Sequence, residues 1–77
     1  ATIDKMLDCS NNNIKELNLR DNNFINLNCS NNNLESLDLI KMTNLINLNC
    51  KNNNISILNI KKLDIISLEV DKTTKIL

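Results

Sequence analysis

The sequence predicts a mostly β solenoid with little or no helix, built from about three and a half stacked coils of 20–21 residues. The first observation is a repeated apolar pair, a leucine followed two residues later by cysteine, leucine, isoleucine or valine. Its leucines stand at positions 7, 17, 27, 37, 48, 58 and 68, so successive pairs are ten or eleven residues apart. The second observation is that cysteine fills every other pair up to position 50, which makes the double unit the true period. The third is strand-like alternation, since both apolar residues of a pair face one side of an extended chain.

Each double unit is too short to return through a helix, so two short extended segments joined by two tight corners are expected. Short parallel strands are therefore predicted on both sides of each coil, about 4.8 Å from those of the next coil. The coils are 7–26, 27–47 and 48–67, followed by a partial fourth at 68–77. No linker or shift of composition interrupts them, so residues 1–77 are predicted to form a single domain. Because the chain begins and ends within repeats, we expect it to be a fragment of a longer one.

Asparagine triplets mark one corner of each complete coil, at 11–13, 31–33 and 52–54. The middle residue is predicted to point inward, where its amide can bond the corner's backbone and its equivalent in the next coil as a structural ladder. These middle residues are Asn12, Asn32 and Asn53. The flanking asparagines are expected to face solvent and to take unusual turn dihedrals, since the chain has no glycine. The alternative is that the triplets form a polar binding strip.

Three cysteines, Cys9, Cys29 and Cys50, occupy the inward slot that Val70 fills in the last coil and belong to the same structural columns. Their spacing does not match the close pairs of zinc sites. Neighbours in adjacent parallel strands point the same way, which is poor geometry for a disulfide. Buried free thiols are therefore expected, with a soft-metal column or a bridge as the alternative.

An 11-residue signature, L-x-x-L-x-L-x-x-N-x-L, is seen at 14–24 and again at 24–34. It resembles the leucine-rich repeat, and its nested ten-plus-eleven form is similar to the 21-residue bacterial class of such repeats. The resemblance covers residues 3–70; Asn22 matches the signature's asparagine, whereas Met42 and Leu63 replace it in later units. The resemblance implies a leucine-rich repeat solenoid whose strand face binds a protein, and it favours a secreted or bacterial cell-surface location.

Composition narrows the function classes. Nine basic residues balance nine acidic ones, which disfavours nucleic acid or an anionic membrane as partner. No apolar run approaches the roughly 20 residues that span a bilayer, so no membrane insertion is expected. The chain has no histidine, and its acidic residues stand singly, so no enzymatic activity, cofactor or metal site is predicted.

Outward-facing positions are where function can vary if the repeat fixes the core. The cysteine-bearing strand face is hydrophilic, and we predict that it binds a protein partner of unknown identity. The predicted contact residues are Asp8, Asn26, Asn28, Asn47, Asn49, Lys51, Ser67 and Glu69. A structural alternative is self-association, in which the open strand edges at 7–9 and 68–70 pair end to end. A third hypothesis places a catalytic activity in a flanking domain outside these residues.

Overall fold

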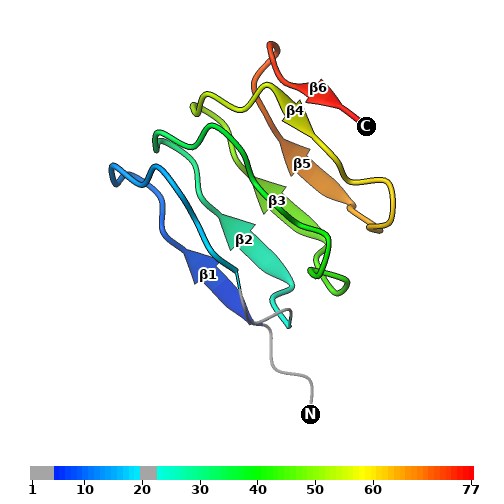
Figure 1. Ribbon diagram of the computed structural model, residues 1–77. Coiled ribbons are helices and arrows are strands. Elements are labelled where there is room, and N and C mark those ends of the chain that lie inside the picture. Colours follow the sequence, from blue (N-terminus) through cyan, green and yellow to red (C-terminus); the bar gives the residue numbers. More distant parts are fainter. Residues whose placement is uncertain (1–4, 20–22) are drawn as a thin grey trace.

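The computed structural model describes residues 5–19 and 23–77, and within these residues six short strands form the regular structure and no helix occurs (Figure 1). The strands are β1 (Met6–Asp8), β2 (Asn26–Asn28), β3 (Asn47–Asn49), β4 (Ile57–Leu58), β5 (Ser67–Glu69) and β6 (Lys75–Ile76). The Cα radius of gyration is 11.6 Å, close to the value of about 11.5 Å expected for a compact chain of this length. The prediction of a small, mostly β fold is confirmed.

Four of the strands form a parallel sheet in the order β1-β2-β3-β5. Its register aligns the leucines at the centre of each strand, Leu7, Leu27, Leu48 and Leu68. The ladder continues one residue beyond the strands, where the Cys29 backbone nitrogen donates to the Asn49 carbonyl at 2.9 Å. The leucine of each strand and the apolar residue two positions later face the interior, whereas the residue between them faces outward. The alternation seen in the sequence therefore predicts which side of this sheet is buried. The prediction of parallel strands is therefore confirmed.

A second, two-stranded parallel sheet joins β4 to β6. The expectation of strands on this side of every coil is wrong, because residues 17–19 and 37–39 form none. Leu17 and Leu37 nevertheless turn inward, Leu37 being buried and Leu17 half-buried. The apolar pair therefore predicted correctly which residues enter the core, but not whether their backbones would pair.

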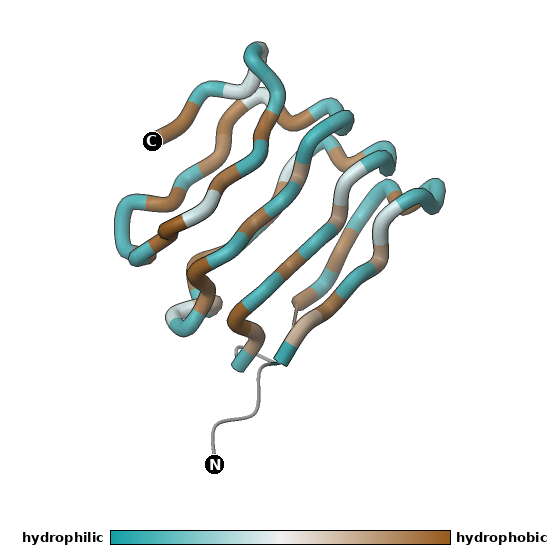
Figure 2. Tube along the Cα trace, turned by 180° about the vertical axis from the view of Figure 1, so that it is seen from behind, coloured by the Kyte–Doolittle hydropathy of each residue, from teal (hydrophilic) through white to brown (hydrophobic). Residues whose placement is uncertain are grey.

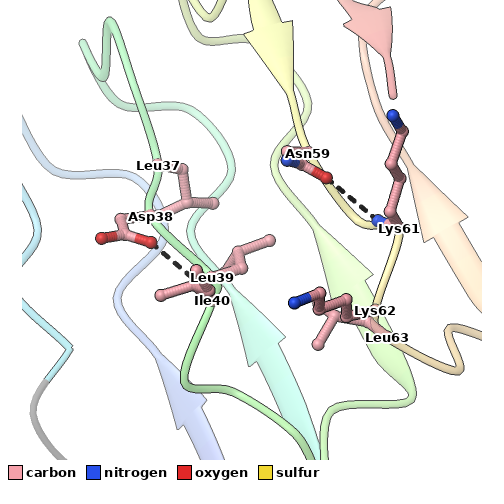
Figure 3. A pocket seen from close by; sticks show the side chains of 8 residues that line it. All are labelled: Leu37, Asp38, Leu39, Ile40, Asn59, Lys61, Lys62 and Leu63. Carbon is pink, nitrogen blue, oxygen red and sulfur yellow. Dashed lines mark hydrogen bonds between the residues drawn. The ribbon is translucent and has the colours of Figure 1, made fainter.

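A hollow of about 320 Å³ lies between residues 37–40 and 59–63 (Figure 3). Two backbone N–H groups beside this hollow donate to a side chain two residues earlier. That of Ile40 donates to the Asp38 carboxylate at 3.1 Å. That of Lys61 donates to the side-chain oxygen of Asn59, also at 3.1 Å.

The hydrophobic core fills the space between the two sides of the chain. Figure 2 shows hydrophobic residues alternating with hydrophilic ones along the strands, as burial of one face requires. The buried apolar residues are Leu27, Cys29, Leu34, Leu37, Leu39, Met42, Leu45, Leu48, Cys50, Ile55 and Leu58. Leu27 and Leu48 of the central strands are buried, whereas Leu7 and Leu68 of the edge strands are half-buried. The core is therefore densest in the middle of the sheet.

Met42 and Leu63, the two departures from the repeated asparagine, form corners without an amide. Met42 is 1 % exposed, its backbone nitrogen donates to the Leu39 carbonyl at 2.9 Å, and its own carbonyl accepts from Leu45 at 3.1 Å. The Leu63 nitrogen likewise donates to Ile60 at 3.0 Å. Backbone turns satisfy these corners, which frees the side chain for the core. Asn22, the matching asparagine of the first coil, lies outside the described residues.

Candidate functional site

The first residue of each asparagine triplet has a left-handed backbone. The φ angles are 59° at Asn11, 56° at Asn31 and 60° at Asn52. Asparagine tolerates this region better than any other residue except glycine, which the chain lacks. All three side chains are exposed, as predicted for the flanking positions. The triplet therefore takes the place of a glycine-containing corner.

The middle asparagine holds the corner together from inside. The Nδ2 of Asn32 donates to the carbonyls of Cys29 at 3.0 Å and Ser30 at 3.1 Å, within its own corner. The same nitrogen lies 3.1 Å from the Cys9 carbonyl of the preceding corner. Its Oδ1 accepts from the Ile14 backbone nitrogen at 3.1 Å. One amide thus bonds backbone groups of two successive corners, including the Ile14 nitrogen.

Asn53 repeats this arrangement one coil later. Its Nδ2 donates to the carbonyls of Cys50 at 3.1 Å and Cys29 at 3.0 Å, and its Oδ1 accepts from Leu34 at 3.0 Å. Asn12, in the first corner, is exposed, and its Nδ2 bonds the carbonyl of Cys9 at 3.0 Å. The middle asparagines therefore differ in burial according to their distance from the end of the sheet.

The contacts between successive corners differ from the expected ladder in one respect. The middle asparagines bond the backbone of the preceding corner, and not the equivalent asparagine side chain. Direct asparagine-to-asparagine bonds occur in two outward columns. The Nδ2 of Asn52 donates to Oδ1 of Asn31 at 2.9 Å, and that of Asn47 donates to Oδ1 of Asn26. In the second and third corners, the donors and acceptors of the inward amides are bonded to backbone groups, because several backbone groups converge at each corner.

The cysteines are free, with Cys29 and Cys50 buried and Cys9 half-buried at the sheet edge. Burial raises the pKa of Cys29 to about 12, with smaller contributions from Cys50 and Cys9. Burial also raises the pKa of Cys50 to about 11, helped by the charge of Asp71. Within residues 5–19 and 23–77, no cluster of three or more histidine, cysteine, aspartate or glutamate side chains is placed to hold a metal ion. The burial of Cys29 and Cys50 fits neutral thiols packed in the core.

The outer face of the four-stranded sheet carries a shallow hollow of about 230 Å³. It is lined by Met6, Asn26, Leu27, Asn28, Asn47, Leu48, Asn49, Ser67 and Glu69. Six of the eight predicted contact residues are brought together here. Asp8 and Lys51 lie on the same strands or just after them but outside the lining. We call the outer surface of the four-stranded sheet, including both this hollow and Asp8, the sheet face.

Two amides of the sheet face are fixed by the backbone. The Oδ1 of Asn28 accepts from the Ser30 nitrogen at 3.1 Å, and the Oδ1 of Asn49 accepts from the Lys51 nitrogen at 3.1 Å. A backbone N–H can only donate, so the oxygen of each amide must face it and the Nδ2 group must face away. Both amides therefore present hydrogen-bond donors to a ligand.

Asp8, on β1, also accepts a hydrogen bond from the backbone nitrogen two residues later. Its Oδ1 accepts from the Ser10 nitrogen at 3.0 Å and from the Ser10 hydroxyl at 2.6 Å. The side-chain bond, and then the backbone bond, lower the pKa of the Asp8 carboxyl. The group is therefore an anion at neutral pH.

Asp71 and Thr74 belong to a corner whose hydrogen bonds the sequence pattern did not predict. The Asp71 carboxylate accepts from the backbone nitrogens of Asn52 at 2.9 Å and Asn53 at 3.1 Å. The Thr74 hydroxyl, 9 % exposed, donates to the Ile55 carbonyl at 2.7 Å. The signal that could have revealed this role is the replacement of the asparagine triplet by Asp-Lys-Thr-Thr after Val70.

The connection between the two sheets is shorter in the last coil than in the coil before it. Leu48 pairs with Leu68 in the first sheet, and Ile57 pairs with Lys75 in the second. The step from a first-sheet position to its second-sheet counterpart is therefore nine residues in one coil, from Leu48 to Ile57, and seven in the next, from Leu68 to Lys75.

The hollow on the second side differs from the sheet face. Its lining is Leu37, Asp38, Leu39, Ile40, Asn59, Lys61, Lys62 and Leu63. Figure 3 shows Leu39 and Lys62 extending toward each other across the gap. Asp38 and Asn59 each accept a hydrogen bond from the backbone nitrogen two residues later, that of Ile40 and that of Lys61.

Comparison with known protein families, with curated protein sequences and with solved structures gave no match. Among the described residues, none forms a helix long and apolar enough to cross a bilayer.

Proposed function

We propose that the chain is a leucine-rich repeat solenoid that binds a protein partner through the sheet face, without enzymatic activity. The solenoid is supported by the register of the four-stranded sheet, in which neighbouring strands lie 20 or 21 residues apart in sequence. It is also supported by the recurrence of one corner structure, with a left-handed first asparagine, in three successive coils.

The observation that carries the binding role is the fixed orientation of Asn28 and Asn49. Their oxygens are held by the backbone nitrogens of Ser30 and Lys51, so two amide donors stand side by side on adjacent strands. Parallel neighbours are about 4.8 Å apart. Groups that are already ordered lose little conformational entropy on binding. The sheet face is thus suited to bind a ligand rich in acceptors, such as a polypeptide.

Binding without catalysis is supported by the position of the acidic groups. Asp8 and Glu69 lie on the two edge strands, three strand spacings or about 14 Å apart. Carboxyl pairs that cleave glycosides are closer, at roughly 5–9.5 Å. The chain also has no histidine to activate a hydroxyl or thiol.

The test begins with selection of peptides from a random display library on the whole chain. Affinity is then measured for Asn49→Asp, which keeps the oxygen that accepts from Lys51 but replaces the outward donor by an acceptor. The matched control is Asn59→Asp, because Asn59 makes the same bond to Lys61 on the second side. We expect Asn49→Asp to weaken binding by about tenfold. Asn59→Asp should bind as the parent does.

Equal affinity of the two variants for every selected peptide would contradict the role of the sheet face. So would side-chain amide signals of Asn28 and Asn49 that stay unshifted in the NMR spectrum when peptide saturates the chain. A shift confined to residues 37–40 and 59–63 would move the binding site to the second side.

A second candidate function is structural, namely end-to-end association of copies. It is supported by the edge strand β1, where Leu7 and Cys9 are half-buried while their neighbours Leu27 and Cys29 are buried. An edge strand offers free backbone groups to a further strand. Light scattering on a size-exclusion column should then show a mass that rises with concentration. A constant monomer mass across the series would exclude this candidate.

A further inference from the structure

One row of the sheet face carries a distinctive order of groups. The register places Asp8, Asn28, Asn49 and Glu69 side by side on β1, β2, β3 and β5. The two ends of the row are carboxylates, and the two middle positions are the amides whose Nδ2 groups face away from the backbone nitrogens of Ser30 and Lys51. Read across the strands, the row presents acceptor, donor, donor, acceptor.

The charge of this surface is negative along the row. The neighbouring row, formed by Met6, Asn26, Asn47 and Ser67, is uncharged. The next row along the strands contains Lys51 and Asp71. Their opposite charges add up to zero. Both bonds from Ser10 end on Oδ1 of Asp8, which leaves Oδ2 to a ligand. Glu69 is exposed. Two anionic ends are therefore available.

The length of the row limits what can bridge it. Three strand spacings amount to about 14 Å. An extended peptide rises about 3.4 Å per residue, so side chains four residues apart are separated by nearly this distance. Residues i and i+4 also project from the same side of an extended chain, whereas i+3 and i+5 project from the opposite side. A helix would need about nine residues for the same span, and it would present side chains on a 3.6-residue period that does not match the strand spacing.

We propose that the occupant of the sheet face is an extended basic peptide segment that crosses β1, β2, β3 and β5, with two lysine or arginine side chains four residues apart. One basic group meets the Asp8 carboxylate and the other meets that of Glu69. Carbonyl oxygens of the peptide between them accept from the Nδ2 groups of Asn28 and Asn49. This inference rests on the proposed binding function and adds the chemistry and spacing of the partner.

The experiment uses the whole chain and terminally blocked, fluorescent serine peptides of equal length that carry two lysines. The lysines are placed two, three, four, five or six residues apart, and binding is followed by fluorescence anisotropy at low salt. We expect the four-residue spacing to bind about fivefold more tightly than the three- and five-residue spacings. The advantage should shrink as salt is added.

The same peptides are then bound to a double variant, Asp8→Asn with Glu69→Gln. Its matched control is Glu16→Gln with Glu35→Gln, which removes the same charge from exposed residues outside the four-stranded sheet. The spacing preference should disappear in the first variant and persist in the second. Circular dichroism of both variants at equal temperature shows whether either has unfolded.

Affinity that follows peptide charge but not lysine spacing would overturn the proposal. An equal loss in the two double variants would also overturn it, because it would show only a general effect of net charge. If display-selected peptides bind the sheet face but contain no basic pair, this inference fails while the proposed function stands. If Asn49→Asp and Asn59→Asp bind alike, the proposed function fails first.

Discussion

The side-chain oxygen of Asn32 accepts a hydrogen bond at 3.1 Å from the backbone nitrogen of Ile14, a residue of the preceding coil. The same side chain donates to the Cys29 carbonyl of its own corner at 3.0 Å. A single buried amide therefore joins two successive corners, through a bond between residues 18 positions apart in the chain. This explains how corners without glycine or proline keep a constant shape from one coil to the next.

Replacing Asn32 by leucine should destabilise the chain by about 1–3 kcal/mol, because the half-buried Ile14 nitrogen loses its acceptor and the Cys29 carbonyl loses one of its two side-chain donors. The measurement is urea unfolding followed by circular dichroism. Asn12→Leu should have a smaller effect, since Asn12 is exposed. A change in free energy of unfolding that is equal at Asn12 and Asn32 would contradict the role of burial.

Replacing Asn11 by valine should destabilise by about 1–2 kcal/mol, because a β-branched residue is strained at a φ of 59°. Asn11→Gly should shift the free energy of unfolding by less than about 1 kcal/mol. Asn13→Val serves as control, since Asn13 is exposed and has no positive φ. Thermal melts of the three variants make the comparison. Equal midpoints for the two valine variants would argue against a left-handed first asparagine.

Stability should fall as the pH rises above about 9, because the thiols of Cys29 and Cys50 ionise in the unfolded chain before they do in the folded one. Burial raises their folded pKa to about 12 and about 11. The unfolded state then binds fewer protons than the folded state, so the free energy of unfolding decreases with pH. The window runs from about pH 9 to the folded pKa values.

The control for this pH dependence is Cys29→Val with Cys50→Val, because Val70 fills the same column in the last coil. Urea unfolding at pH 8 and pH 10.5 should show a larger loss for the parent than for this variant. Parallel losses in both proteins would assign the effect to other groups, such as the lysines.

Asp71→Ala should destabilise by about 0.5–2 kcal/mol, the range found when an acceptor for exposed backbone N–H groups is removed. The groups concerned are the nitrogens of Asn52 and Asn53, both bonded by the Asp71 carboxylate. Asp64→Ala is the control, since Asp64 is exposed and lies in the preceding corner. Hydrogen exchange provides the local readout. Unchanged protection at Asn52 in Asp71→Ala would rule out this cap.

Sequence periodicity predicted the first sheet because its signal is strong at each coil. The leucine at 27 and that at 48 occupy equal positions in an alternating pattern, and alternation together with a constant step leaves one register. The same pattern occurs at 37–39, yet no strand forms there. Pairing depends on the distance between backbones, which the periodicity of a single segment does not encode.

The sheet face was predictable as a set of outward residues but not as a set of oriented groups. Alternation alone places Asn28 and Asn49 outside the core. Which end of each amide faces a ligand depends on the bond to the backbone two residues later, a local turn that asparagine and aspartate favour. The hydrogen bonds of Asp71 were not predictable from the repeat, because Asp71 replaces the residues that recur at the other corners.

The in-register stacking of the first sheet is tested most directly by NMR couplings across its hydrogen bonds. The backbone nitrogen of Cys29 should couple to the carbonyl carbon of Asn49, and that of Cys50 to the carbonyl carbon of Glu69. Cys9 should couple likewise to Asn28. Couplings shifted by one residue along either strand, or found between other partners, would contradict this register and the row of groups on the sheet face that depends on it.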